Sequence, residues 1–175
     1  MTSFPVLSTP RLILRQLEET DDKAVFSLRS DDRVNRFLER NKPADIEEAR
    51  SFITKINNAI AENQSLYWAI GLKEDPALIG SICLWNYSPD KKTAELGYEL
   101  SPRQQGKGLM NEALEAVIRF AFDTGGIAVL EAYTHKDNHA SSRLLMKQGF
   151  TLLQERKDSE NENLVIYALS NSLQQ

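Results

Sequence analysis

The segment from Glu95 to Glu112 constrains the fold of this chain more than any other. A strand pattern over residues 93–100, in which apolar and acidic residues alternate, continues through a glycine-containing turn into a long helix pattern over residues 108–122. The helix pattern repeats apolar residues at spacings of three and four, which gives one apolar face. This junction predicts a domain that mixes strands and helices along the chain.

The turn in this segment reads Arg103-Gln104-Gln105-Gly106-Lys107-Gly108 and has the composition of an anion-binding site. Glycine lets the backbone approach a ligand closely and adopt unusual torsions. The first amides of a helix lack partners within it, and the helix dipole favours negative charge at that end. Lys107 adds a positive charge. The turn is therefore predicted to bind phosphate. The alternative is a strand-to-helix turn in which glycine serves shape alone.

Two common phosphate-binding motifs do not fit this turn. A P-loop needs a glycine where this chain has Ser101, and a Ser or Thr where it has Gly108. A dinucleotide-binding fingerprint needs a third glycine at the position of Asn111. Both motifs are therefore excluded.

The remaining elements have a mixed order, with helices first, then an antiparallel meander, then alternating strands and helices. Helix patterns are expected after Asp22, around Val34 to Leu38, after Asp45, over 108–122 and over 140–148. Strand patterns are expected over residues 11–16, 66–72, 78–85, 93–100, 127–134, 150–154 and 164–169. The sequence predicts a mixed α/β or α+β fold in one domain over residues 1–175.

Composition narrows the class of protein. A chain of 175 residues with 41% hydrophobic residues is long enough to build one core without disulfides, and the lone Cys83 fits a reducing compartment. We expect a soluble, cytoplasmic protein, since no apolar run is as long as a membrane span and no secretory signal is visible. The net charge of −4 disfavours nucleic acid as a partner and is compatible with a cationic substrate. His135 and His139 have no further ligand at metal spacing, so no metal site is expected.

Four segments, in order, resemble the GCN5-related N-acetyltransferase (GNAT) superfamily, and more narrowly its RimJ/RimL-like branch of ribosomal-protein N-acetyltransferases. The turn fits that superfamily's pyrophosphate motif, Arg/Gln-x-x-Gly-x-Gly/Ala. The segments are Thr9-Pro10-Arg11-Leu12-Ile13-Leu14-Arg15 with Asp21, Ala94-Glu95-Leu96-Gly97-Tyr98-Glu99-Leu100, Gly106-Lys107-Gly108-Leu109-Met110-Asn111-Glu112-Ala113, and Asp137-Asn138-His139-Ala140-Ser141 with Lys147-Gln148-Gly149-Phe150. The resemblance implies a mostly antiparallel mixed sheet of about seven strands, flanked by helices and splayed between strands 93–100 and 127–134.

The resemblance also implies an acetyl-CoA site, with no metal. Pantetheine would lie in the splay and pair with the backbone of residues 99–101, and pyrophosphate would meet the amides of residues 105–109. Asn138 and Ser141 would face the pantetheine and thiol, although Asn138 also suits a helix cap and Ser141 a solvent-facing first turn. The implied cofactor-binding residues are Glu99, Leu100, Ser101, Arg103, Gln105, Gly106, Lys107, Gly108, Leu109, Asn138 and Ser141.

The catalytic groups are less well defined by the resemblance. Several relatives use a Glu on the fifth strand as base and a Tyr on the last helix as acid, and this chain has Tyr133 and Leu145 there. Glu95 is the first candidate base, acting through a water chain, and Glu99 is the second. The alternative is that Glu95 has a structural role, in which its carboxylate binds neighbouring backbone groups or an arginine. By analogy, Ser141 would hydrogen-bond the thiolate, and the Leu100 amide would donate to the oxyanion.

These features predict an acetyl-CoA-dependent N-acetyltransferase that acts on a primary amine, with a protein N-terminal α-amine favoured by the branch. One alternative is a small-molecule N-acetyltransferase for a polyamine, an amino acid or an aminoglycoside. Another is a CoA-binding sensor without catalysis, because both expected catalytic groups are missing. The expected partner is the amine substrate, and neither nucleic acid nor a membrane is expected as a partner. The protein is expected to be a monomer or a homodimer. We expect acceptor specificity in residues 34–63 and in the loop between the last two strands.

Overall fold

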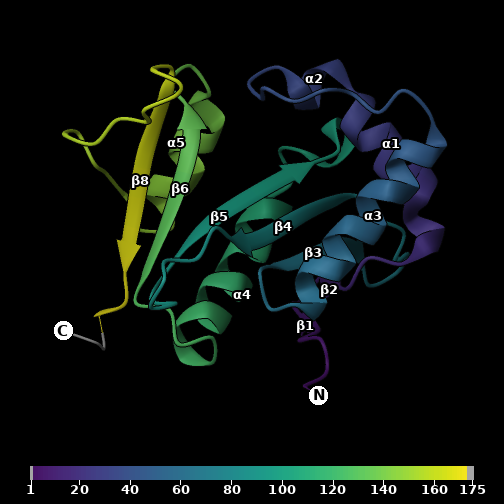
Figure 1. Ribbon diagram of the computed structural model, residues 1–175, viewed down its shortest axis with the longest axis horizontal. Coiled ribbons are helices and arrows are strands. Elements are labelled where there is room, and N and C mark those ends of the chain that lie inside the picture. Colours follow the sequence, from purple (N-terminus) through teal and green to yellow (C-terminus); the bar gives the residue numbers. More distant parts are fainter. Residues whose placement is uncertain (1, 173–175) are drawn as a thin grey trace.

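The computed structural model describes residues 2–172, which fold around one eight-stranded sheet with the order β1-β2-β3-β4-β5-β6-β8-β7 (Figure 1). All neighbouring strands are antiparallel except β5 and β6. The strands are β1 (Leu7–Ser8), β2 (Leu12–Arg15), β3 (Leu66–Leu72), β4 (Gly80–Trp85), β5 (Thr93–Leu100), β6 (Val129–His135), β7 (Thr151–Leu152) and β8 (Leu164–Ser170).

The helices cover both faces of this sheet. They are α1 (Asp22–Ser30), α2 (Asp32–Asn35), α3 (Ile46–Ala61), α4 (Leu109–Asp123) and α5 (His139–Lys147). On one face, α4 and α5 pack on a cluster that includes Trp68 and Leu114. On the other face, α1 and α3 pack on a cluster that includes Tyr67 and Ile53. Consecutive residues of β3 therefore serve opposite clusters, as the pleat of a strand requires. None of the helices within residues 2–172 is long and apolar enough to cross a membrane.

The mostly antiparallel sheet that the sequence predicts is confirmed, with eight strands instead of about seven. The additional strand is β1, whose two residues are too few to show a periodic pattern. The strand expected over 150–154 is only two residues long, Thr151–Leu152. The helix expected around Val34 to Leu38 begins earlier, at Asp32, because Asp31 caps it by accepting a hydrogen bond from the Arg33 amide. It ends at Asn35.

The splay between strands 93–100 and 127–134 is also confirmed, as the separation of β5 from β6. β5 pairs with β4 from Glu95 to Leu100. It pairs with β6 only from Thr93 to Glu95, opposite Val129 to Glu131. Beyond Glu95 the two strands diverge, while β6 stays paired with β8 along all seven of its residues. In Figure 1, α2 lies above the wide end of this gap.

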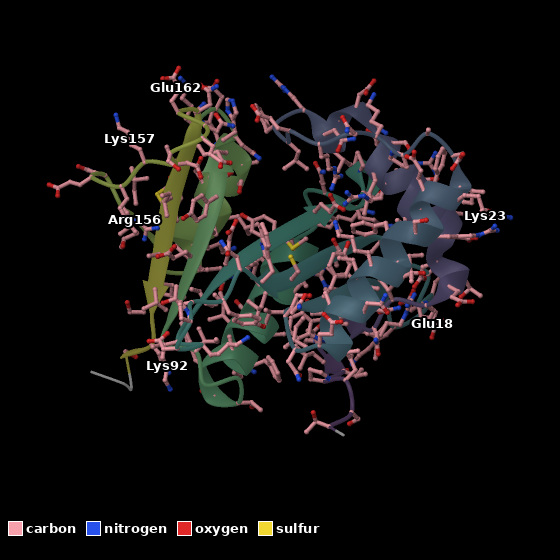
Figure 2. The ribbon with its side chains drawn as sticks, in the orientation of Figure 1. Glu18, Lys23, Lys92, Arg156, Lys157 and Glu162 are labelled. Atoms are coloured by element: carbon pink, nitrogen blue, oxygen red, sulfur yellow. The ribbon has the colours of Figure 1, made fainter. Side chains whose placement is uncertain are left out.

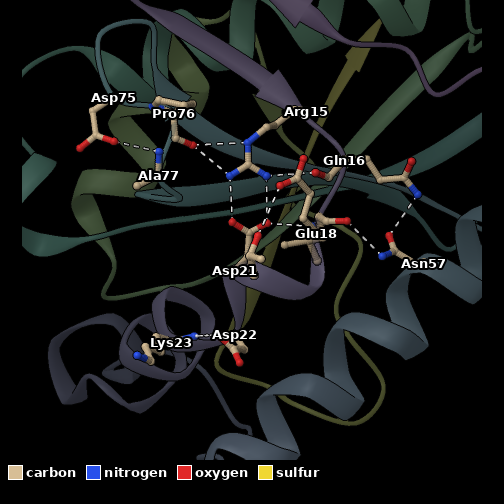
Figure 3. A network of polar contacts seen from close by, with 12 residues as sticks. Arg15, Gln16, Glu18, Asp21, Asp22, Lys23, Asn57, Asp75, Pro76 and Ala77 are labelled. Carbon is tan, nitrogen blue, oxygen red and sulfur yellow. Dashed lines mark hydrogen bonds and ion pairs between the residues drawn. The ribbon is translucent and has the colours of Figure 1, made fainter.

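A polar network fastens α1 to the sheet at the N-terminal side (Figure 3). Arg15 of β2 donates to both carboxylate oxygens of the buried Asp21, at 2.9 and 2.8 Å, and to the carbonyl of Pro76, at 2.9 Å. Asn57 of α3 donates to the Leu17 carbonyl, at 3.1 Å. Because a bidentate pair of this kind fixes orientation as well as distance, the network sets the position of α1 and α3 on their face of the sheet.

Candidate active site

A cavity of about 600 Å³ lies beside the end of β5, at the end of that strand that is not paired with β6. It is bounded by α2 and the residues after it, the end of β5, the glycine turn, and the first turns of α4 and α5. The lining residues are Arg33, Val34, Arg36, Phe37, Leu38, Tyr98, Glu99, Leu100, Gln105, Gly106, Gly108, Leu109, Met110, Asn138, Ala140, Ser141 and Leu144. Eight of the predicted site residues meet here, namely Glu99, Leu100, Gln105, Gly106, Gly108, Leu109, Asn138 and Ser141.

The cavity connects the two faces of the sheet. Tyr98 and Glu99 are consecutive residues of one strand, so their side chains point to opposite faces, yet both line the cavity. Tyr98 contacts Ser141 of α5 on one face, and Glu99 contacts Arg29 of α1 on the other. Two ligands that approach from opposite faces are therefore able to meet in the gap.

The glycine turn forms the wall on the α4 face. Gly106 and Gly108 both have a φ of +77°, a left-handed conformation that strains other residues. The first backbone bond back into α4 runs from the Glu112 amide to the Gly108 carbonyl, at 3.2 Å, so the amides of residues 109–111 have no partner within the helix. Arg11 holds the turn from outside by donating to the Lys107 carbonyl, at 2.9 Å. The turn is thus shaped to accept an anion.

Lys107 and Arg103 do not line this cavity. Lys107 instead donates to the Gln104 side chain, at 3.2 Å. The amide-rich backbone, together with Gln105, contributes the polar groups that face the cavity from the turn.

The end of β5 presents backbone groups to the gap. The Ser101 amide donates to the Ile79 carbonyl, at 2.8 Å, toward β4. Because backbone groups alternate in direction along an antiparallel strand, the amide and carbonyl of Leu100 point away from β4, into the gap. The Gln105 side chain donates to that carbonyl, at 3.0 Å. Both backbone groups of Ser101 are used within the fold, since its carbonyl accepts from the Gln104 amide, at 2.9 Å. The expected pairing of pantetheine with the Ser101 backbone is therefore not supported.

Two hydroxyl groups face each other across the gap. The oxygens of Tyr98 and Ser141 lie 2.6 Å apart, and either one is able to donate. Burial raises the pKa of Tyr98 to about 12, so the phenol is protonated at neutral pH. Asn138 caps α5 by accepting from the Ser141 amide, at 3.2 Å, which confirms the capping role that the sequence left open.

The two candidate bases differ in their surroundings. Glu99 forms an ion pair with Arg40, at 2.7 Å, and lies 3.9 Å from Arg29. Glu95 lies outside the cavity, about 13 Å along the strand from Glu99. It accepts a hydrogen bond from the Asn86 side chain, at 3.1 Å. Burial, followed by the nearby charges of Glu131 and Asp158, raises the pKa of Glu95. Because Glu95 does not line the cavity, a proton would reach its carboxylate only through a chain of water molecules. Its role as the base stays a prediction.

Comparison with known proteins matches residues 11–151 to a domain described as acetyltransferase (GNAT) domain. The chain belongs to the GNAT acetyltransferase family. The uncharacterized N-acetyltransferase YoaA of Bacillus subtilis is 35% identical over 147 residues, which cover 84% of this chain and 83% of YoaA. The ribosomal-protein-serine acetyltransferase of Escherichia coli is 36% identical over 80 residues, 46% of this chain and 44% of that protein.

The fold agrees with this assignment. A solved structure of RimL, a ribosomal L7/L12 alpha-N-protein acetyltransferase in complex with coenzyme A, superposes with a TM-score of 0.84 at 22% identity. The match covers 95% of this chain and 98% of that one. The protein is thus an acyltransferase of the GNAT family with a mixed α/β fold.

Within the GNAT framework, the two replaced positions have structural roles. Leu145 is fully buried in the core on the α4 face. Tyr133 accepts a hydrogen bond from Arg156, at 3.1 Å, and Arg156 also pairs with Glu131. Figure 2 shows Arg156 on the outer side of the β8 end of the sheet, beside the loop that carries Lys157. Neither position supplies a free acid or base to the cavity.

Sequence reasoning missed several residues of the cavity. Tyr98 is one of them, because the alternation over residues 93–100 gives no sign that its phenol reaches a cavity. The wall formed by α2 and the residues after it was expected only in general terms. Within residues 2–172, no group of three or more His, Cys, Asp or Glu is placed to hold a metal ion.

Proposed function

We propose that this GNAT protein transfers the acetyl group of acetyl-CoA to a primary amine, and that the amine is a protein N-terminal α-amine. The observation that carries the proposal is the cavity beside the end of β5, which is lined both by the glycine turn and by α2 with the residues after it. The α4 face of the cavity has the anion-binding turn, and the other face opens under α2. A cosubstrate and an amine are therefore able to approach one another from opposite faces.

The residues present fit acetyl-CoA, which supplies the acetyl group as a thioester. The turn at Gly106 and Gly108, with the free amides of α4, would hold the pyrophosphate. The Leu100 backbone, which points into the gap, would pair with pantetheine and donate to the carbonyl oxygen as negative charge develops on it. Asn138 and Ser141 line the part of the cavity between these two regions.

Proton movements in the proposed reaction use the groups nearest the gap. A proton would pass from Ser141 to the departing thiolate and from Tyr98 to Ser141, since their oxygens are 2.6 Å apart, and Tyr98 would regain its proton from water when the products leave. The amine must lose a proton to attack, and Glu95 would accept it through water. Glu99 is less suited to that role, because two guanidinium groups already neutralise its carboxylate.

Two lines of support favour a protein N-terminus as the acceptor. Relatives include a ribosomal-protein-serine acetyltransferase. A polyamine would also find no free carboxylate in the cavity, because Glu99, the only acidic residue among the described lining residues, is paired with Arg40. Besides Arg33 and Arg36, the residues that α2 and the segment after it contribute to the cavity are apolar, namely Val34, Phe37 and Leu38.

The test measures thiol release from acetyl-CoA by the full-length protein with a panel of amines, and mass spectrometry locates the acetyl group. The panel contains peptides with a free N-terminus, the same peptides with a blocked N-terminus, spermidine, amino acids and an aminoglycoside. We expect acetylation of the free N-terminus only. Turnover with spermidine or an aminoglycoside alone contradicts the protein acceptor, and cofactor binding without turnover on any amine supports a sensor instead.

A further inference from the structure

The charges around the acceptor side of the cavity are unbalanced. Arg29, Arg40 and Glu99 form a cluster with two positive groups and one negative group. Their side chains are only 20%, 19% and 8% exposed, so water screens the surplus positive charge weakly. Buried charges in proteins are normally paired, and this cluster lacks a second anion among the described residues.

Arg36 adds a further positive charge at the cavity wall. Of the two arginines that α2 and the residue after it contribute, Arg33 is paired with Asp31, at 2.7 Å. The Arg36 guanidinium makes only a ring contact with its neighbour Phe37, at 4.9 Å from the ring centre. Phe37 in turn contacts the ring of His135, which fixes this part of the wall against the end of β6. Arg36 is therefore an exposed cation, held at the cavity, without a carboxylate partner among the described residues.

These charges lie on the acceptor side and not on the side of the pyrophosphate turn. Arg29 and Arg40 meet Glu99, whose side chain is on the sheet face opposite Tyr98 and α5. Phe37, next to Arg36, contacts the ring of His135. Side chains alternate along β6, and Thr134 is buried on the α4 face, so His135 lies on the opposite face. An ammonium group that enters from this side meets positive charge unless its own molecule also carries an anion.

We propose that the acceptor carries a carboxylate close to its reacting amine, as an acidic residue at the second position of a peptide does, and that Arg36 binds this carboxylate. The inference rests on the proposed acetyltransferase function and adds the chemical class of the acceptor. A guanidinium binds a carboxylate through charge-assisted hydrogen bonds, which are stronger than neutral ones. The surplus charge at Arg29 and Arg40 contributes a longer-range attraction to the same group.

The test compares peptides that differ only at the second residue, which is Glu, Gln or Lys, together with free glutamate and spermidine. For the wild-type protein, we expect kcat/KM for the Glu peptide to exceed that for the Gln peptide about tenfold, as one charge-assisted contact allows. The Lys peptide and spermidine should be poorer still. A carboxylate near the reacting amine occurs both in a peptide with an acidic second residue and in a free amino acid. Free glutamate distinguishes these two acceptors, because it should be the best acceptor if the natural substrate is an amino acid.

Arg36→Gln should reduce the ratio of the Glu to the Gln peptide toward one. Arg119→Gln, on the exposed face of α4, is the matched control and should keep the wild-type ratio. Equal kcat/KM for the Glu and Gln peptides, or an unchanged ratio in Arg36→Gln, overturns the inference. A higher KM for acetyl-CoA with every acceptor, at an unchanged ratio, would assign Arg36 to the cofactor instead. If no amine is acetylated by the wild-type protein, the proposed function fails and this inference fails with it.

Discussion

The hydroxyl oxygens of Tyr98 and Ser141 lie 2.6 Å apart across the gap between β5 and α5. This contact places a phenol beside the serine that would donate to the thiolate. Leu145, at the position where the family resemblance implies a tyrosine acid, is fully buried in the core and has no hydroxyl to offer. In the proposed reaction, β5 therefore contributes the phenol that α5 lacks.

Tyr98→Phe removes this hydroxyl and keeps the ring. We expect the rate of acetyl transfer to fall on the order of 100-fold, as for loss of a general acid, while the Kd for acetyl-CoA changes little. A single-turnover assay isolates the chemical step from product release. Tyr87→Phe is the matched control, since Tyr87 is also half-buried but does not line the cavity. An unchanged single-turnover rate in Tyr98→Phe rules out this proton route.

Gly106→Glu should abolish tight binding of acetyl-CoA, because it places a carboxylate at the predicted pyrophosphate site. Gly126 offers a closely matched control. Both glycines have positive φ, +77° and +70°, and a Cβ added at either meets nothing within 4 Å. Gly106→Glu and Gly126→Glu should therefore lose similar stability, about 1 kcal/mol each, from backbone strain. Isothermal titration should show a Kd for acetyl-CoA that rises more than about tenfold in Gly106→Glu only. A similar Kd in both variants contradicts the pyrophosphate assignment.

The turn and its helix were predictable from sequence because their signals are local. Glycine, the end of an alternating strand and the start of an apolar helix face all lie within residues 93–122. The splay followed from family resemblance and not from periodicity. The two-residue strand β1 gave no usable pattern, since two residues do not define an alternation, and the strand that contains β7 was predicted too long.

The charged wall of the cavity was not predictable in the same way. Glu99 on β5 meets Arg29 on α1 and Arg40 in the loop before α3, and only tertiary packing brings these residues together. The sequence made Glu99 the second candidate base, whereas the fold pairs its carboxylate with Arg40. The different surroundings of Arg33, which pairs with Asp31, and Arg36, which contacts the Phe37 ring, are likewise not visible in the sequence pattern.

The pair of Arg40 and Glu99 should be important for stability. Arg40→Gln leaves the largely buried Glu99 carboxylate with only Arg29, at 3.9 Å, so we expect a loss of about 2 kcal/mol in the free energy of unfolding. Glu99→Gln should be similarly destabilising, because it leaves two arginines unpaired. Urea denaturation of both single variants and the double variant measures their coupling. If the two losses add without any coupling, the ion pair does not contribute as the structure indicates.

Glu95→Gln should increase stability at neutral pH and decrease turnover. Burial and the charges of Glu131 and Asp158 raise the pKa of Glu95 above its ordinary value of 4.5. Folding therefore favours the protonated form, and the stability that this group contributes is full below pH 4.5 and is lost as the pH rises through the raised pKa. Gln does not ionise and so avoids this loss. The Tm of Glu95→Gln should exceed that of the wild type at about pH 8, and the difference should disappear at about pH 4.

Glu74→Gln, in the exposed loop between β3 and β4, is the control and should leave both Tm and turnover unchanged. The two readouts of Glu95→Gln separate its structural and catalytic roles. A raised Tm with full turnover, measured with the best peptide acceptor, shows that Glu95 is a strained carboxylate and not the base. If Glu95 is the base and burial raises its pKa, Glu95→Gln should raise the Tm. It should also remove the acidic limb of the pH profile of kcat/KM.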